Sequence, residues 1–249
     1  MSATRAKPIT ELNAFIKRLR LHTVLSEEDA AAIRSLPWMM ATRKQNAHLA
    51  REGDITGQCT VLLDGYAHRF RLTDEGERQI LAIYVPGDPI DFDHLYLPTA
   101  DDGLQALRDS VLAQVQHHAL RSLMAERANV AEAIMRAMLV DSSIFREWTL
   151  NVGRRDARAR ISHMLCEVST RLEVQGVDLL NTPLPLTQDQ IADATGLTPV
   201  HVNRTLKSLS ADGYLTRRKG LVILPNPRAL WQIAGFDPRY LHLQPNRAT

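Results

Sequence analysis

The sequence predicts an α+β chain in which an N-terminal β-barrel of the jelly-roll type is followed by a long helix and then by a helix-turn-helix unit with a β-hairpin. Three observations predict this order. Short β-type runs with recurring glycines fill residues 38–118, a helical apolar period runs through 119–152, and two short helical patterns flank Gly196. The expected divisions are 1–118 for the barrel with its N-terminal helices, 119–152 for the central helix, 153–226 for the helix-turn-helix unit and 227–249 for an extension.

Charge is distributed unevenly along the chain. The 249 residues carry a net charge of +2, which by itself indicates no class of partner. Residues 1–153 carry a net charge of −3, whereas residues 154–224 carry +3 and residues 225–249 carry +2. We therefore expect an acidic domain and a basic domain with different partners.

Several classes of protein are excluded by composition. The chain has two cysteines, Cys59 and Cys166, so a single chain cannot supply a disulfide framework or a four-cysteine iron–sulfur site. Sparse cysteine is typical of a reducing compartment, and we expect a cytoplasmic protein. The first residues lack the apolar segment of a signal peptide, and no uncharged apolar run has the length of a membrane helix.

The barrel region is predicted to follow two short helices over 10–36, the second of them capped by Ser26 with acidic residues in its first turn. Residues 66–72 and 77–85 alternate between apolar and polar side chains on either side of the turn sequence TDEG, which predicts a hairpin. A further strand is expected over 110–118. Many short strands with glycine turns favour a small barrel or jelly roll.

The central helix carries a narrow apolar seam with steps of four and three residues, which Asp141 interrupts. Either the helix packs on its own barrel, or it crosses the same helix of a second copy. We favour the dimer, because Phe145 and Trp148 lie far from the barrel in sequence. Asp141 would then set the register, weaken dimerisation by repulsion, or face solvent. The predicted dimer residues are Val130, Ile134, Met138, Phe145, Trp148 and Val152.

The segment that begins at Thr187 has the pattern of two short helices joined by a tight turn. Thr187 and Gln190 have capping-box spacing, Gly196 supplies the turn, and Thr198 caps a second helix with Pro199 at its first position. Residues 214–224 then predict a β-hairpin wing with three cations at its tip. The side chains expected to face inward are Ile191, Thr195, Val202, Thr205, Leu206 and Leu209.

The outward face of the second helix carries no acidic residue. Val200, Asn203 and Arg204 are residue types that read base edges in a major groove, where they recognise the thymine methyl group, adenine and guanine respectively. An ordinary solvated helix does not account for the order of these features along the chain: the cap at Thr187, the small residue Ala192 where the two helices cross, the turn at Gly196 and the basic hairpin. The neighbouring residues expected to contact the DNA backbone are Thr187, Gln188, Thr198, His201, Lys207, Arg217, Arg218 and Lys219.

A second amphipathic helix is predicted over 153–176, and four arginines stand at its start. Positive charge there opposes the helix dipole. For these arginines we favour a structural or hinge role over direct contact with DNA. They are Arg154, Arg155, Arg158 and Arg160.

These motifs resemble those of the Crp/Fnr family of bacterial transcription regulators. Residues 186–224 are similar to its winged helix-turn-helix, most specifically in LTPVHVNRTLKSL, and residues from about 40 to 120 are similar to its cyclic-nucleotide-binding-like β-barrel, through REGD, LLDGYAHRF and EGERQILAIYVPGD. The resemblance implies a homodimer that reads a (pseudo)palindromic DNA site through the helix at 198–210, with RNA polymerase as a further partner. It also implies an effector that the barrel senses and the central helices report.

Two departures from the family pattern concern the effector and the DNA half-site. Members that bind cyclic AMP have Gly-Glu after the PGD turn and Arg-Ser later, where this chain has Asp91-Phe92 and Asp102-Gly103. The acidic side chains here would repel a phosphate, so we expect no response to cyclic AMP. In the recognition helix, Val200 and Pro199 replace a Glu and an Arg, whereas Arg204 matches, so the half-site should differ. The acidic residues are Asp91, Asp93, Asp101 and Asp102.

Two other function classes were weighed against a DNA-binding regulator. A metal or haem sensor, or an enzyme, would need regularly spaced ligands, whereas His117 and His118 are expected on opposite faces of a strand. A small-molecule signalling module with a protein-binding C-terminal unit is disfavoured by the basic wing. We therefore predict no enzymatic activity, no metal site and no cofactor, and the identity of the effector stays open. At the end of the chain, we expect a last helix over 226–241 that packs on the wing. The metal-type side chains considered are Asp91, Asp93, His94, His117 and His118.

Overall fold

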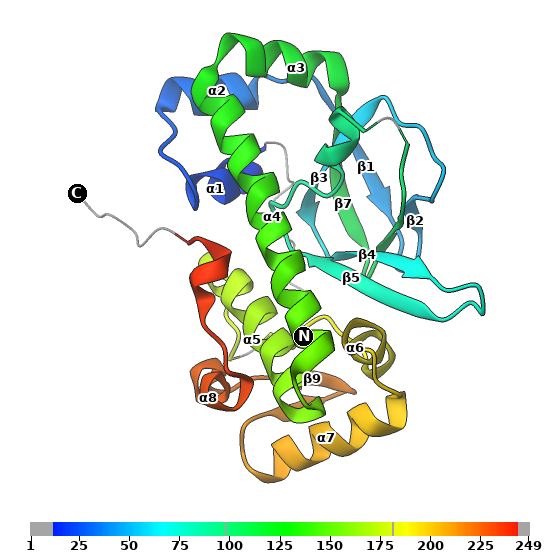
Figure 1. Cartoon of the computed structure of the whole chain (residues 1–249). Coiled ribbons are helices and arrows are strands. Elements are labelled where there is room, and N and C mark those ends of the chain that lie inside the picture. Colours follow the sequence, from blue (N-terminus) through cyan, green and yellow to red (C-terminus); the bar gives the residue numbers. More distant parts are fainter. Residues whose placement is uncertain (1–11, 98, 181, 244–249) are drawn as a thin grey trace, which may run out of the picture.

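The computed structural model describes residues 12–97, 99–180 and 182–243. A two-sheet β domain occupies one side of a long helix, α4, and a smaller helical domain with a β-hairpin lies at the far end of that helix (Figure 1). This is the α+β architecture that the sequence predicts.

The β domain is a sandwich of antiparallel strands. In the described part of the chain, one sheet has the order β1-β7-β3 and the other has the order β2-β6-β4-β5. Neighbours that are not consecutive in sequence indicate jelly-roll connections. The strands are β1 (Trp38–Arg43), β2 (His48–Ala50), β3 (Gln58–Asp64), β4 (Ala67–Leu72), β5 (Arg78–Tyr84), β6 (Gly103–Ala106) and β7 (Ser110–Gln116).

The predicted hairpin over 66–85 is confirmed as β4 and β5. Its turn is closed because the Thr73 amide donates to the Glu77 carbonyl and Gly76 adopts φ 83°. The expected strand over 110–118 ends earlier, at Gln116. His117 and His118 form the first turn of helix α3 (His117–Glu126), so the expectation that they lie on opposite faces of a strand was wrong. Gln116 pairs with Gln58, the first residue of β3, so β3 offers no partner for the residues that follow.

Two N-terminal helices, α1 (Asn13–Arg20) and α2 (Glu27–Arg34), share a core with α3, α4 and the strands β3 and β7. Ser26 caps α2 as predicted, in a capping box with Asp29. The predicted single helix over 119–152 is divided into α3 and α4 (Ala128–Arg154), because Arg127 adopts an extended conformation between them. The break allows side chains from both helices to enter one core: Leu120, Leu123, Val130 and Ile134.

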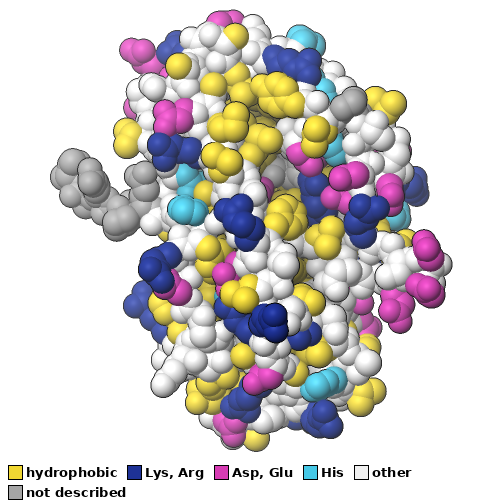
Figure 2. Space-filling model, in the orientation of Figure 1, with side chains coloured by type: hydrophobic (Ala, Val, Ile, Leu, Met, Phe, Trp, Pro, Cys, Tyr) yellow, Lys and Arg dark blue, Asp and Glu magenta, His cyan; other side chains and the backbone are white. Residues whose placement is uncertain are grey.

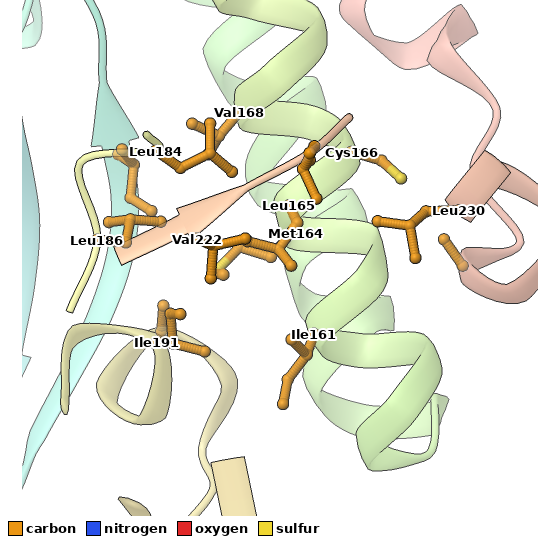
Figure 3. Close-up of a cluster of buried hydrophobic side chains, with 14 of the residues drawn as sticks. Ile161, Met164, Leu165, Cys166, Val168, Leu184, Leu186, Ile191, Val222 and Leu230 are labelled. Atoms are coloured by element: carbon orange, nitrogen blue, oxygen red, sulfur yellow. The ribbon is translucent and has the colours of Figure 1, made fainter. Parts of the chain in front are cut away.

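The C-terminal domain is built around α5 (Ala157–Val174), which is buried over most of its surface rather than on one stripe. Figure 3 shows its side chains directed toward Leu184, Leu186, Ile191 and Val222 on one side, with Leu230 beside Cys166 on another. Cover comes from α6 (Gln188–Thr195), α7 (Pro199–Ala211), β8 (Thr216–Arg218) and β9 (Leu221–Ile223).

The last helix that the sequence predicts over 226–241 is instead a series of short pieces that pack against α5 and α4. Gly235, in a left-handed conformation, and prolines at 227 and 238 interrupt a continuous helix. The carbonyl oxygen of His242 lies 3.1 Å from Nδ1 of His22, which follows α1. The pieces are η2 (Pro227–Leu230), α8 (Trp231–Ala234) and η3 (Pro238–Leu241).

A buried carboxylate joins the two domains. Asp88, in the turn after β5, is fully buried and accepts from Arg18 Nε at 2.7 Å and from an Arg171 terminal nitrogen at 2.5 Å. Arg18 belongs to α1 and Arg171 to α5. Burial alone would raise the pKa of Asp88, but Arg171 and Arg18 hold that pKa below its usual value.

We predict that Asp88→Asn lowers the free energy of unfolding by about 3–5 kcal/mol, because both arginines stay buried and lose their shared counter-ion. Urea unfolding at neutral pH measures this change. Asp109→Asn is the matched control, since Asp109 pairs with Lys44 at 2.7 Å on the exposed surface and its loss should change stability little. Equal effects of the two substitutions would contradict the structural role of Asp88.

Candidate nucleic-acid interface

The helix-turn-helix has the local geometry that its sequence predicts. Thr187 and Gln190 form a capping box at the start of α6, and Gly196 ends that helix in the left-handed conformation with φ 62°. The Thr198 hydroxyl accepts from the His201 amide and caps α7, which begins with Pro199. The turn and both helix starts are therefore fixed by local hydrogen bonds.

The two faces of α7 separate as expected. The predicted inward residues of both helices are buried, which confirms that part of the analysis: Ile191, Thr195, Val202, Thr205, Leu206 and Leu209. On the outward face Val200 is 81% exposed, Arg204 is exposed and Asn203 is half-buried. An apolar side chain as exposed as Val200 contributes nothing to the core of this domain.

The residues expected to contact the DNA backbone surround this face. Thr198 and Lys207 are exposed, and His201 is half-buried on the same helix. Arg218 and Lys219 are exposed on the hairpin, where Lys219 and Gly220 form the turn with positive φ. Figure 2 shows Lys, Arg and His side chains around the lower end of the molecule, where α7 lies.

Arg217 is not at the hairpin tip, where the sequence analysis placed it. It lies on β8, half-buried, and its terminal nitrogen donates to Asn203 Oδ1 at 3.3 Å. The Gln188 amide lies against the same guanidinium, and both groups are satisfied when the amide oxygen accepts from Arg217. Three residues predicted to act separately on DNA therefore contact one another.

The helix predicted over 153–176 begins later, at Ala157, because Arg154 ends α4 and Arg155 is extended after it. Of the four arginines, Arg155, Arg158 and Arg160 have partners within the protein, which supports the structural role favoured for them. Arg155 pairs with Glu147 at 2.6 Å, and Arg158 pairs with Asp212 at 2.5 Å after the end of α7. Arg160 donates to the Thr195 carbonyl at 2.8 Å, which satisfies a free carbonyl at the end of α6. These contacts fix the helix-turn-helix on α5.

The predicted dimer seam of α4 combines two faces of the helix. Val130, Ile134 and Trp148 are buried in the core of their own chain, and Trp148 Nε1 donates to Glu167 at 2.9 Å. Apolar residues occupy more than one face of α4, and the sequence pattern did not separate the self-packed face from the other. Met138, Phe145 and Val152 are half-buried, beside the exposed Met135 and Leu139.

A small cavity of about 130 Å³ lies between the barrel and α4, with Arg69, Tyr84, Asp93 and Asp141 among the residues that line it. All five N–H donors of Arg69 have partners. Asp93 accepts two of them in a bidentate pair, at 2.8 and 3.0 Å, and Asp102 accepts another at 2.9 Å. The Tyr84 hydroxyl and the Ile90 carbonyl, each at 3.0 Å, accept the remaining two.

The sequence predicts only that the acidic residues near this cavity repel anions. In the structure several of them also accept hydrogen bonds from the protein. Asp93 and Asp102 form ion pairs with Arg69, and the Asp91 carboxylate accepts a hydrogen bond from the Thr60 amide at 2.5 Å. Burial raises the pKa of Asp91 to about 7. Burial also raises the pKa of Asp141 to about 7, although Arg18 lies 3.7 Å away.

Neither a membrane span nor a metal cluster emerges within the described ranges. No helix there combines the length and the apolar character needed to cross a bilayer. No three His, Cys, Asp or Glu side chains there are grouped so that they could hold a metal ion.

Sequence comparisons match each domain separately. The family model for the cyclic nucleotide-binding domain matches residues 42–127, and the model for the Crp-like helix-turn-helix domain matches residues 159–233. The fumarate and nitrate reduction regulatory proteins of Vibrio cholerae and Escherichia coli K12 are similar to this chain. The first is 23% identical over 194 residues, 78% of each chain, and the second is 24% identical over 187 residues, 75% of each chain.

Solved structures share the fold along most of the chain. FixK2 from Bradyrhizobium japonicum matches with a TM-score of 0.73 and 22% identity, covering 81% of this chain and all of that one. The c-di-GMP responsive regulator CLP from Xanthomonas campestris matches with a TM-score of 0.62 and 20% identity, covering 80% and 99%. With both domain models matched in succession and the same fold over about four fifths of its length, the chain belongs to the Crp/Fnr family of DNA-binding, non-enzymatic transcription regulators.

Proposed function

We propose that this regulator acts as a homodimer that reads a (pseudo)palindromic DNA site with α7 and that it does not respond to cyclic AMP. The observation that carries the proposal is the outward face of α7. Val200, at 81% exposure, stands beside Arg204 and Asn203 on a helix whose opposite face is fully committed to the core. Val200 and Arg204 thus project from this helix without contributing to the domain core.

The base-reading roles are assigned by the chemistry of each side chain. Arg204 presents a guanidinium that pairs bidentately with guanine, Val200 presents a methyl surface suited to a thymine methyl group, and Asn203 presents an amide. Around them, the exposed cations and small hydroxyl groups would hold phosphates and set the register of the helix in the groove. The residues that we propose for contact with the DNA backbone are Thr187, Gln188, Thr198, His201, Lys207, Arg218 and Lys219.

A rigid platform supports this reading. Arg160 binds the carbonyl end of α6, and Arg158 binds Ser208 and Asp212 at the far end of α7. The end of α6 and the end of the recognition helix are thus both tied to α5. Preorganisation of this kind limits the ordering cost when DNA binds.

A second copy would complete the reader through α4. Next to its buried face, α4 carries a half-buried and exposed face with a spacing of three and four residues, which is the spacing of a helix–helix seam. Exposed Met135, on this seam, and exposed Leu139, next to it, form an apolar strip, and Figure 2 shows apolar side chains along the middle of the molecule. Two recognition helices related by such a dyad would reach half-sites about 34 Å apart. The seam residues are Met135, Met138, Ser142, Phe145, Thr149 and Val152.

The absence of a cyclic-nucleotide response rests on Arg69. A phosphate would need a cationic donor in the cavity between barrel and α4, and every donor of this arginine is already taken by protein groups. The cavity volume of about 130 Å³ is also below the roughly 300–1,000 Å³ typical of small-molecule sites. The residues present do not fit a cyclic nucleotide.

Selection of bound sequences from a random DNA pool, without added ligand, should yield a two-fold symmetric motif. On that motif Arg204→Ala should cost about 1–3 kcal/mol of binding free energy and relax one base position in each half-site. Lys207→Ala is the control, expected to weaken all sequences alike and to reduce the salt slope by about one. If Arg204→Ala weakened random and selected DNA equally, Arg204 would not read a base.

Replacing Met135 and Leu139 together by Asp should raise the dimer dissociation constant at least about tenfold, because unpaired charges would enter an apolar interface. Analytical ultracentrifugation measures the association. Arg136→Ala is the control, since Arg136 is exposed on the same helix and pairs only with Glu132 in the described structure. An unchanged monomer–dimer equilibrium in the double variant would place the interface elsewhere.

Titration with cyclic AMP and cyclic GMP at millimolar concentration should produce no binding heat in calorimetry and no change in DNA affinity. The physical reason is the complete pairing of Arg69 within the barrel. Saturable binding of either nucleotide would show that Arg69 exchanges its carboxylate partners for phosphate and would overturn this part of the proposal.

A further inference from the structure

Arg217 lies on the inward face of the β8–β9 hairpin. Its cross-strand partner is Val222, which is buried in the domain core, and cross-strand partners share one face of an antiparallel pair. The adjacent residues Thr216 and Arg218 are exposed on the other face. The pleat of the strand therefore directs Arg217 toward α7, whereas it directs Arg218 outward.

The guanidinium of Arg217 holds the carbonyl side of the Asn203 amide. Its terminal nitrogen donates to Asn203 Oδ1 at 3.3 Å, and the Gln188 amide contacts the same guanidinium from α6. One cation thus links the first helix, the recognition helix and the wing.

Orientation decides what an asparagine reads. Bidentate recognition of adenine needs Oδ1 to accept from the adenine amino group while Nδ2 donates to N7. When Oδ1 is held toward the wing, the planar amide places Nδ2 on the opposite side of Cγ. Asn203 then offers the base edge a donor alone. Adenine can accept at N7, but its N6 amino group is left without an acceptor, whereas guanine presents two adjacent acceptors (O6 and N7) and thymine presents O4.

We propose that Arg217 is a positioning residue that sets the base preference of Asn203, holding its oxygen so that Asn203 favours guanine or thymine over adenine. This inference rests on the proposed function, because it assumes that α7 lies in the major groove. It replaces the phosphate contact that the sequence suggests for Arg217. The same geometry assigns Gln188 to the positioning of Arg217.

Selection from a random DNA pool with the full-length protein tests the proposal, using wild type, Arg217→Ala, Arg217→Met and Asn203→Ala. Arg217→Met keeps the apolar stem and guards against a packing defect, and thermal unfolding checks that each variant is folded. Both Arg217 variants should shift one position in each half-site toward adenine by at least about threefold, in the range of coupling between contacting residues. That position should be the one whose preference Asn203→Ala removes.

Arg218→Ala is the matched control on the outward face of the same strand. It should weaken binding to all sequences alike and lower the salt slope by about one, with the motif unchanged. If the Arg217 variants behave in that way, or leave the motif and the affinity unchanged, Arg217 does not position Asn203. In an Asn203→Ala background, loss of Arg217 should no longer alter base preference, and a persisting shift would overturn the proposal. Failure of the wild type to select any motif would instead contradict the proposed function.

Discussion

The arrangement of the two domains depends on one buried carboxylate. Asp88 follows strand β5 of the barrel and is shared by an arginine from the N-terminal helix and one from the first helix of the DNA-binding domain. A buried arginine without a counter-ion costs several kcal/mol, and Asp88 lies closer to Arg18 and to Arg171 than any other carboxylate in the described structure. Arg171 also donates a hydrogen bond to the Ile83 carbonyl at 2.8 Å, and Ile83 lies on β5, the barrel strand that precedes Asp88. The position of the recognition helix relative to the barrel follows from this contact.

From Asp88 the polar network continues toward the end of α4. Arg171 lies 3.4 Å from Glu167, and Glu167 accepts from the Trp148 indole at 2.9 Å and from the Tyr240 hydroxyl at 2.8 Å. A buried carboxylate with this many donors is satisfied rather than strained. The helix expected to mediate dimerisation, the DNA-binding domain and the C-terminal segment are therefore parts of one hydrogen-bonded unit. The α4–α5 connection, Arg155 and Asp156, lies next to this unit.

Features set by neighbouring residues were predictable from the sequence, and features set by distant partners were not. The caps at Ser26, Thr187 and Thr198 and the turn at Gly196 follow from local hydrogen bonds and backbone preference. The break at Arg127 has no proline or glycine to announce it, and the inward turn of Arg217 depends on a pairing with Val222 that composition does not encode. In α4, apolar residues occupy both the face that packs on the chain's own core and the face proposed for dimerisation. Periodicity alone therefore assigned Val130, Ile134 and Trp148 to the dimer seam, although they are buried in the core of their own chain. Arg69 was missed because its two carboxylate partners lie 24 and 33 residues away.

The contact between His22 and His242 has a consequence for synthesis of the chain. Residues 220 positions apart meet beside α1, where His22 also contacts Arg18 of the interdomain cluster. During translation the barrel can fold as soon as its strands have emerged, since domains fold as units from the N-terminal side. The contact with His22 has to wait until His242 has left the ribosome. The nascent protein thus acquires its barrel early and this contact between its two ends last.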